Sequence, residues 1–251
     1  KQTTQMSFSV HNEATGFEYN GHTFTSLFAQ RRNIFRPKFW RLLYDIVRFN
    51  KLCKAMHEKG DYQSDQSLGQ LLNDNQFNDF FKYHYILPMG AAIWSTSIKE
   101  MENVGVEFFV KFFFNHGLLD VTNRPQWYVV PGGSRQYIKP LIRGFADKIN
   151  LNTNIKSVTR QNDEVTIEFA NGEQSKFDKV IFACHSDQAL ALLGDATEQE
   201  KSVLGAIAYT ENSVVLHTDT NLLPDRKAAW ASWNYLLNNN TDKAAVVTYQ
   251  M

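Results

Sequence analysis

A short stretch in the second half of the chain, "KVIFACHSD" at residues 179–187, holds the side chains best suited to direct chemistry. Cys184, His185 and Asp187 have the types of a cysteine nucleophile, its base and an orienting carboxylate, and the same three types also bind metal ions. A third interpretation is a buried strand that ends in a small thiol. The choice decides whether the protein works through its own side chains or through a molecule that it holds.

Strand geometry argues against a cysteine nucleophile in this stretch. The apolar run from Val180 to Ala183 is typical of a strand, and neighbouring side chains on a strand point to opposite faces. Cys184 and His185 would therefore not face one substrate, and a reactive cysteine also needs surroundings that lower its pKa. We expect Cys184 to be a buried thiol at a strand end.

Other self-contained catalytic sites lack their sequence signals. The seven histidines are scattered, without His-x-x-x-His or Cys-x-x-Cys spacing, so we predict no metal site. No serine lies in a Gly-x-Ser-x-Gly turn. The residues alone therefore assign no catalytic group.

Dinucleotide binding has only a partial signal. The Gly-x-Gly-x-x-Gly pattern lets a backbone approach a pyrophosphate closely, and the 13 glycines of this chain include no Gly-x-Gly. One glycine pair, Gly132-Gly133, lies between an apolar strand-like run and a helix-like segment. It predicts either an ordinary turn or one part of a cofactor site whose phosphate cradle lies elsewhere.

Composition excludes some classes of protein. Lys plus Arg and Asp plus Glu are 26 each, which argues against nucleic-acid binding driven by overall positive charge, although a local basic face remains possible. The two cysteines, Cys53 and Cys184, predict no disulfide framework and favour a reducing, cytoplasmic location. The apolar runs are too short or too charged to span a membrane. The oligomeric state is not predicted.

The high aromatic content, 14 % with 19 phenylalanines, has two explanations. Aromatic side chains could pack between helices in the core, or they could line an apolar pocket for a small molecule. The sequence leaves both open.

The first half of the chain predicts strands followed by helices. Residues 6–24 are typical of two short strands joined by a turn around 12–16, and 37–59 of a helix with Pro37 in its first turn. Ser67 begins a second helix that we expect to be interrupted near Pro88. A third helix over 104–116 is apolar on most faces and ends at Gly117.

The second half predicts a meander and further strands. After 125, an apolar run meets the glycine pair, and an amphipathic helix begins at Ser134 or at Pro140. Strands are expected over 152–161, 164–170 and 179–184, with an Asn171-Gly172 turn. A helix over 195–206 and strands at 212–218, 229–236 and 243–250 follow. The chain begins and stops inside strand-like runs, so we expect it to be a segment of a longer protein.

Several of these stretches resemble a known family. The run "VVPGGSRQYIKPL" and the meander after it resemble the middle of flavin-containing amine oxidases. The stretches "YILPMGAAIWS", "ACHSDQALALL" and "AWASWNY" are similar to a bacterial subgroup described as predicted NAD/FAD-binding, amine-oxidase-like proteins. The resemblance covers nearly the whole chain and is strongest over 127–236.

The resemblance implies an α+β fold in three parts. Residues 1–126 would form a substrate-binding region of helices and antiparallel sheet, and 127–198 the middle piece of an FAD-binding domain with its β-meander. Residues 199–251 would return to the antiparallel sheet of the substrate domain. The Gly-rich FAD motif expected upstream is absent, as is the C-terminal segment that closes the flavin site, so FAD is expected in the full-length protein and not in this segment alone.

The resemblance also implies roles for single residues. The backbone of Ile155 would contact the FAD adenine, Ala183 and Cys184 would lie near the dinucleotide, and Gly132 and Gly133 would support the turn beside it. Three tryptophans are candidates for the walls of a substrate pocket or for simple core packing: Trp94, Trp230 and Trp233.

Three functions remain in competition. The first is an FAD-dependent oxidoreductase of the amine oxidase type, which oxidises an amine or another apolar small molecule by hydride transfer to flavin and is inactive as the isolated segment. The second is an FAD-dependent desaturase or isomerase acting on a lipid or carotenoid-like substrate. The third is a module without enzymatic activity that binds an apolar ligand.

Overall fold

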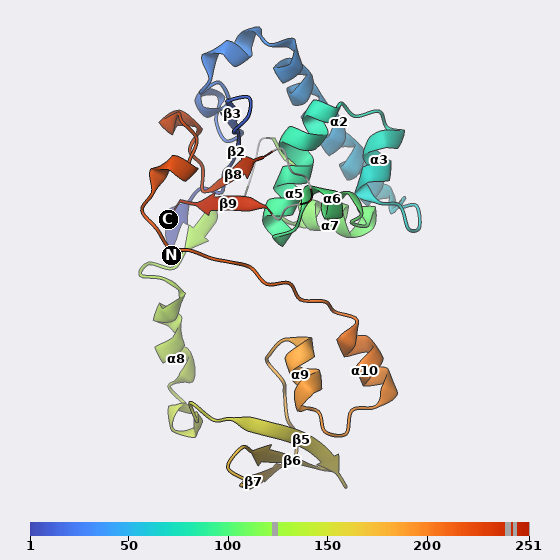
Figure 1. Ribbon diagram of the computed structural model, residues 1–251, viewed down its shortest axis with the longest axis vertical. Helices are drawn as coiled ribbons and strands as arrows, with labels where there is room; N and C mark the ends of the chain where they lie inside the picture. Colours follow the sequence, from blue (N-terminus) through green and yellow to red (C-terminus); the bar gives the residue numbers. More distant parts are fainter. Residues whose placement is uncertain (122–124, 239–241, 243–244, 251) are drawn as a thin grey trace. The chain divides into compact units, whose positions relative to one another are not determined.

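The computed structural model describes residues 1–121, 125–238, 242 and 245–250. Contacts along the chain divide it into two compact units, shown with their elements in Figure 1. Unit 1 consists of Lys1–Ser134 with Leu216–Met251, and unit 2 of Arg135–Val215. The domain boundaries expected at 126/127 and 198/199 stay a prediction, and each unit is described by itself below.

Unit 1 contains a four-stranded sheet in the order β3-β2-β8-β9. These strands are β2 (Phe8–Asn12), β3 (Phe17–Asn20), β8 (Trp233–Leu237) and β9 (Val246–Tyr249). Strands β2 and β3 form the predicted hairpin. Strand β8 pairs antiparallel with β9 but parallel with β2, so the sheet is mixed and not wholly antiparallel as expected. A second, two-stranded sheet pairs β1 (Gln2–Thr4) with β4 (Trp127–Val129).

The α-helices of unit 1 lie between β3 and β4 in the chain. They are α1 (Phe24–Leu27), α2 (Pro37–Lys59), α3 (Leu68–Asp74), α4 (Asp79–Phe81), α5 (Leu87–Trp94), α6 (Ile98–Glu102) and α7 (Val106–Asn115). Short 3-10 helices are η1 (Arg31–Phe35), η5 (Thr220–Leu222) and η6 (Lys227–Ala229). Mixed helices and small sheets confirm the α+β class.

Helix α2 follows the sequence signals closely. Pro37 occupies the first helical position, where its missing N–H costs nothing, and Gly60 ends the helix in the left-handed conformation with φ of 64°. Helix α7 ends the same way, because Gly117 has φ of 65° and the next amide donates to the Phe113 carbonyl.

The interruption expected near Pro88 lies elsewhere. The chain leaves the helical conformation after α3 and resumes it at Asp79, and Pro88 lies inside a continuous helical run. That run includes a π-helical turn, η2 (Lys82–Ile86), in which the Leu87 amide bonds to the Lys82 carbonyl five residues back. A π turn re-spaces the backbone hydrogen bonds, which lets the helix accept a proline that cannot donate one.

Phenylalanine packing forms much of the core of unit 1. Phe49 of α2 contacts three rings from other segments, Phe77, Phe81 and Phe109, at centroid distances of 5.6–6.3 Å in tilted or edge-to-face geometry. All four rings are buried. Helix packing therefore explains a large part of the aromatic content.

Unit 2 holds a three-stranded antiparallel meander in the order β5-β6-β7. Its elements are α8 (Ile138–Ile142), β5 (Ile155–Gln161), β6 (Glu164–Phe169), β7 (Gln174–Phe177), α9 (Ser186–Leu192) and α10 (Glu198–Gly205), with 3-10 turns η3 (Ser134–Tyr137) and η4 (Ala146–Lys148) at its start. Gly172, with φ of 87°, makes the predicted turn between β6 and β7.

Two expected strands are wrong. Residues 178–184 and 212–218 are irregular, and Ile181 and Val214 are 91 % and 89 % exposed. A strand needs a neighbour to complete its ladder of hydrogen bonds, and within the described residues neither segment has one. The strand expected over 229–236 begins only at Trp233, and β9 falls inside the predicted 243–250.

The helices of the described ranges are short or carry polar and charged side chains. None of them combines the length and the apolar character needed to cross a membrane.

Candidate functional site

A hollow of about 620 Å³ lies in unit 1 where the β2–β3 hairpin meets the start of α2 and the α4–η2 turn. We call it the aromatic hollow. It is lined by the apolar residues Phe17, Phe35, Pro37, Phe39 and Phe80 and by the polar residues Asn12, Thr15, Arg36, Lys38 and His84. Mostly apolar walls with a few convergent polar groups are typical of small-molecule sites.

His84 is the polar group set most firmly into this hollow. Its ring stacks on Phe80 at a centroid distance of 4.1 Å and meets Phe17 edge-on at 5.5 Å. Burial lowers the pKa of His84 to about 4, so the ring is neutral near pH 7. Asn12 Nδ2 lies 3.4 Å from His84 Nε2 and can only donate, which makes Nε2 the acceptor. His84 can therefore orient a ligand, but it is a weak base.

The charge around the aromatic hollow is positive. Arg36 and Lys38 belong to its lining, which includes no acidic residue. Arg36 Nη1 donates to the neutral side chains of Gln30 and Asn33 at 3.3 and 3.1 Å, so no carboxylate neutralises its charge there. This arrangement favours an acidic or uncharged ligand over a protonated amine.

A second hollow, of about 880 Å³, lies within unit 2. We call it the sheet–helix hollow because it is lined by the meander, by residues 180–186 and by α9 and α10. Val158, Val180 and Phe182 form part of its apolar wall, and Cys184 also faces it. Among the described residues of unit 2, only Val158 and Ala189 are buried apolar side chains, so this wall is largely uncovered.

Three of the residues assigned to the cofactor lie in unit 2. Ile155 begins β5 and is 39 % exposed. Ala183 and Cys184 lie in the irregular segment before α9, and the expected burial of Cys184 is wrong because its thiol is exposed. The expected strand over 179–184 does not form, and this explains the difference, because a strand inside a sheet would have covered the thiol.

The other two cofactor candidates, Gly132 and Gly133, lie in unit 1. The Gly133 amide donates to the Val130 carbonyl at 2.9 Å, and Gly132 has φ of 78° after Pro131. This is the pattern of a type II turn, which requires glycine at its third position. The structure therefore gives the pair a turn function, and its role beside a cofactor stays a prediction.

The Cys184–His185 pair does not form a nucleophile and base. The His185 ring stacks on Tyr209 at 4.4 Å with only 7° between the ring planes. His185 also precedes α9, where its backbone amide bonds to the Gln188 side chain. No hydrogen bond joins Cys184 to His185 in the described part of the chain, so no local base activates the thiol.

FAD does not fit the described residues of unit 2 by themselves. A pyrophosphate needs backbone amides at a helix start or free cations. Arg160, the one cation in the lining of the sheet–helix hollow, donates to Glu200 at 2.6 and 2.9 Å and to Asp195 Oδ2 at 3.0 Å. These bonds raise the pKa of Arg160 and lower that of Glu200 to about 2. The two carboxylates already balance the guanidinium, and the Ser186 amide at the start of α9 already donates to the Tyr209 hydroxyl at 2.9 Å, so neither group is free to hold a phosphate.

The three candidate tryptophans lie in unit 1, apart from the lining of both hollows. Trp94 contacts the rings of Phe108, Phe112 and others in α7, with its nearest ring centroid at 4.8 Å. Trp230 Nε1 donates to the Pro224 carbonyl at 2.7 Å, and Trp233 meets Tyr249 edge-on at 5.3 Å. Each has a packing partner, and a role in a substrate pocket stays a prediction.

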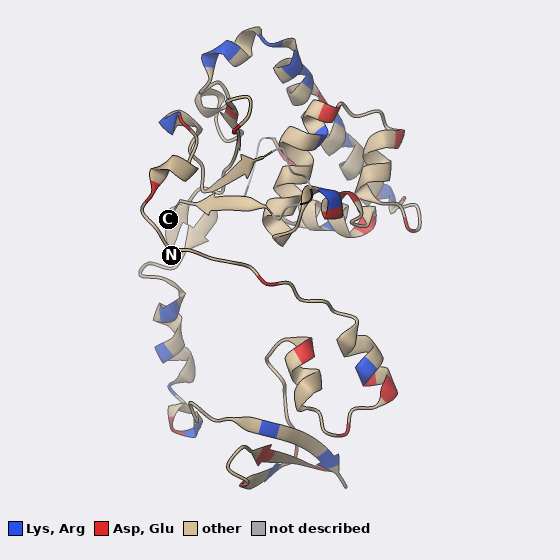
Figure 2. Cartoon of the chain, viewed as in Figure 1, with Lys and Arg blue, Asp and Glu red and all other residues tan. Residues whose placement is uncertain are grey.

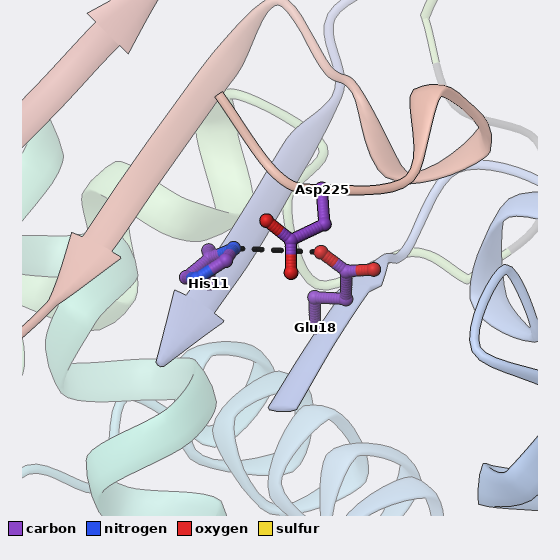
Figure 3. Close-up of side chains that lie close together, drawn as sticks. All are labelled: His11, Glu18 and Asp225. Carbon is purple, nitrogen blue, oxygen red and sulfur yellow. Dashed lines mark ion pairs between the residues drawn. The ribbon is translucent and has the colours of Figure 1, made fainter. Parts of the chain in front are cut away.

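A cluster of titratable side chains joins the β2–β3 hairpin to the segment between η5 and η6 (Figure 3). His11 and Glu18 are cross-strand partners, and their Nδ1 and Oε2 atoms lie 3.4 Å apart. A carboxylate oxygen of Asp225 completes a group whose ligand atoms all lie within 4.8 Å of one another. These types and distances could accommodate a divalent metal ion.

One carboxylate of this cluster, that of Glu18, already has a cation beside it. Glu18 is fully buried, and its Oε1 accepts a hydrogen bond from Arg226 Nη1 at 2.5 Å. The guanidinium offsets the cost of burying that carboxylate. Arg226 and Glu18 thus form an ion pair that holds the segment before η6 against the hairpin, whereas the buried atoms His11 Nδ1 and Glu18 Oε2 have no hydrogen-bond partner within the described ranges.

Sequence reasoning missed the residues that define the aromatic hollow. Phe80 and His84 lie four residues apart, the spacing that places two side chains on one helix face, and this was the signal available. Arg36 and Lys38 flank Pro37 at the start of a predicted helix, but nothing local shows that they border a hollow with the hairpin.

Comparison with solved structures gives a match to the crystal structure of a CLA-producing fatty acid isomerase from P. acnes. The identity is 13 %, the TM-score is 0.49, and the match covers 81 % of this chain and 46 % of that one. This chain thus spans less than half the length of the protein that it matches. Comparison with curated proteins gives no match.

Comparison with sequence families gives a match that covers most of the chain. The family described as flavin containing amine oxidoreductase matches residues 17–249, which include both units. The resemblance noted in the sequence is thereby confirmed, and the chain belongs to the family of flavin-containing amine oxidoreductases.

Proposed function

We propose that this chain is the central part of an FAD-dependent oxidoreductase, with unit 1 binding the substrate and unit 2 forming the middle piece of the FAD domain. Family membership supports the cofactor and the reaction type. When bound in the full-length protein, FAD would supply the redox chemistry, as the acceptor of a hydride from the substrate. The proposal includes the placement of Ile155, Ala183 and Cys184 near the dinucleotide, with the turn at Gly132 and Gly133 beside it.

The aromatic hollow is the observation that carries the assignment of unit 1. Its phenylalanine walls would exclude water from an apolar substrate, and neutral His84 would offer one oriented hydrogen-bonding group. The described side chains include no Cys–His pair or free phosphate cradle that would favour another reaction type. The protein's part is to bind and orient the substrate, while the cofactor supplies the redox chemistry.

The charge at this hollow favours the second candidate function, a desaturase or isomerase of the same family acting on a lipid. Arg36 and Lys38 would attract the carboxylate of an apolar acid and repel a protonated amine. An amine remains the substrate class expected from the family description. The two candidates therefore differ in the sign of the substrate's charge.

Spectroscopy of the protein made from the complete gene tests the cofactor. A flavoprotein is yellow and absorbs at about 450 nm. A colourless protein that takes up no added FAD would contradict the proposal and favour a module that binds an apolar ligand without catalysis. The isolated 251-residue chain is expected to show no turnover.

Anaerobic mixing with candidate substrates then separates amines from apolar acids. Loss of the flavin absorbance with long-chain acids, or a shifted double bond in the recovered acid without net flavin reduction, supports the lipid candidate if primary amines give neither change. The two readouts are needed because desaturation reduces the flavin, whereas isomerisation is redox-neutral overall. If the lipid candidate is supported, the R36Q/K38Q variant should raise KM for the acid with little change in kcat. The control K176Q/K201Q removes the same charge from unit 2. Bleaching by amines alone would support the amine oxidase candidate.

A further inference from the structure

The surface of unit 1 between α1 and the middle of α2 combines exposed apolar side chains with an excess of positive charge. We propose that this surface docks the protein onto anionic lipid membranes without crossing them. We define the basic aromatic surface by its apolar members Phe24, Ile34, Phe35, Trp40, Tyr44 and Val47 and its cations Arg31, Arg32, Arg36, Lys38 and Arg41.

The apolar members are strongly exposed. Phe35 is 86 % exposed, Phe24 76 %, Tyr44 58 % and Trp40 50 %. Large apolar side chains that gather on one surface mark an interaction site more often than single scattered ones do. Tyr and Trp are also the residues enriched where a membrane meets water, because they join an apolar ring to a polar group.

Contacts join these side chains into one surface. Phe28 meets Phe24 at 4.8 Å and Trp40 at 5.7 Å between ring centroids, which brings α1 next to the start of α2. Trp40 Nε1 donates to the Ile34 carbonyl at 2.8 Å and ties η1 to the same place. The surface is therefore built by packing and not by nearness in the sequence alone.

Helix α2 carries two apolar faces. Phe39, Leu42 and Phe49 are fully buried in the core. Trp40, Tyr44 and Val47 lie within about 60° of one another around the helix, on the side away from those buried residues, at the 100° advance per residue of an α-helix. The second apolar face is left in water, as expected of a helix that lies on a membrane surface.

The charge pattern selects an anionic partner. Between Glu18 and Asp45 the sequence has five Lys or Arg residues and no acidic residue. Figure 2 shows these cations along η1 and the first turns of α2. Arg41 pairs with buried Asp45 at 3.0 Å, whereas the other four form no ion pair with a carboxylate in the described part of the chain. Clusters of this kind bind anionic lipid headgroups.

Other occupants fit less well. A second copy of the chain placed by a two-fold axis would set these cations against one another. Single-stranded nucleic acid would satisfy the cations and stack on the rings, but it offers little to aliphatic Ile34 and Val47. A membrane satisfies both, because its headgroups are anionic and its boundary region accepts apolar side chains.

The proposal goes beyond the redox function and does not depend on FAD. Phe35, Arg36 and Lys38 also line the aromatic hollow, so that hollow adjoins the docking surface. A ligand drawn from the membrane would reach it without passing through bulk water. The test therefore uses residues outside the lining of the hollow, which keeps the failure of one proposal separate from the failure of the other.

The experiment is co-sedimentation of the full chain with lipid vesicles. We expect binding to vesicles of phosphatidylcholine mixed with phosphatidylglycerol, weaker binding to phosphatidylcholine alone, and release as salt is raised. The variants F24S/Y44S and R31Q/R32Q should each weaken binding to the anionic vesicles about ten-fold or more. All four positions are on the surface, and circular dichroism checks that the variants fold.

Matched controls carry the same changes elsewhere. F108S/Y128S removes an exposed Phe and Tyr of unit 1 outside the basic aromatic surface, and K176Q/K201Q removes two cations from unit 2. Both should bind like the unmodified chain. Absence of binding to anionic vesicles, or equal weakening by variants and controls, would overturn the proposal. If vesicles fail to bind, two other results would also contradict membrane docking. One is binding to a single-stranded oligonucleotide that F24S/Y44S abolishes, and the other is self-association that F24S/Y44S abolishes.

Discussion

The hydroxyl of Tyr19, on strand β3, donates a 2.8 Å hydrogen bond to the backbone carbonyl of His84 in the π-helical turn. In a regular α-helix this carbonyl would accept from residue 88, but residue 88 is a proline and has no N–H. The buried tyrosine supplies the missing donor and holds the hairpin against the helix that carries His84. One contact thus satisfies the backbone beside Pro88 and positions a wall of the aromatic hollow.

Replacing Tyr19 with Phe should destabilise unit 1 by about 1 kcal/mol, because the His84 carbonyl loses its donor. Urea denaturation followed by circular dichroism measures the change. Pro88→Ala restores an amide at the position that an α-helix would use. In the P88A background the Tyr19→Phe cost should be smaller, and equal costs in both backgrounds would contradict this account.

The stability of the chain should depend on pH through His84. An unfolded histidine titrates near 6.5, whereas burial lowers the pKa of folded His84 to about 4. Between these values the unfolded state binds a proton that the folded state does not bind. The free energy of unfolding therefore falls as pH drops from about 6.5 to about 4, by at most about 3 kcal/mol, and this contribution levels off below.

His84→Gln isolates that contribution, since glutamine does not titrate. The slope of unfolding free energy against pH between 4 and 6.5 should be shallower in the variant than in the unmodified chain. Above pH 7 the two slopes should coincide. An unchanged slope in the acidic window would show that His84 is not the group responsible.

Gly90→Ala should destabilise unit 1, because α5 packs closely against buried side chains at this position. A Cβ at this position of α5 would lie 2.3 Å from Met101 Sδ and 3.3 Å from a ring carbon of Phe109, and both neighbours are fully buried. Overpacking of this kind costs about 1–3 kcal/mol. Gly21→Ala, where no atom lies within 4 Å, should change stability by less than about 0.5 kcal/mol. If the double variant G90A/M101A loses less stability than the sum of the losses in G90A and M101A, Met101 is the obstacle to the added methyl group.

Cys184→Ala in the full-length enzyme should leave turnover largely intact. The thiol is exposed and the neighbouring His185 ring stacks on Tyr209, so no base is positioned to activate it. Comparing kcat with and without the change, at equal FAD content, gives the answer. Complete loss of activity with FAD still bound would show that Cys184 takes part in catalysis.

Local signals in the sequence predicted the elements that depend on near neighbours. Pro37 marked the start of a long helix, Ser67 the start of the next, and Asn171-Gly172 a hairpin turn. Each rests on the conformational preference of one or two residues, so no distant part of the chain is needed to decide it. The helix through Pro88 was misjudged because the donor that replaces its amide comes from Tyr19, far away in the sequence.

Strands depended on partners that a local pattern does not identify. The apolar run at 180–183 has the composition of a strand, yet it has no neighbour among the described residues and stays irregular. Conversely, β8 gains its place by pairing parallel with β2, and Ser9 bonds to Asn234 across 225 residues of sequence at 2.8 Å. No short sequence pattern predicts such a pairing.

The sequence by itself therefore determined the family, the mixed fold class and the lack of a Gly-x-Gly motif, and it argued against a cysteine nucleophile. Only the tertiary structure decided that a hairpin, the start of α2 and a π-helical turn enclose the aromatic hollow, with cations at its lining and an apolar face beside it. The reason is physical. Backbone preferences act between neighbouring residues, whereas burial, pairing and charge balance depend on which distant segments meet.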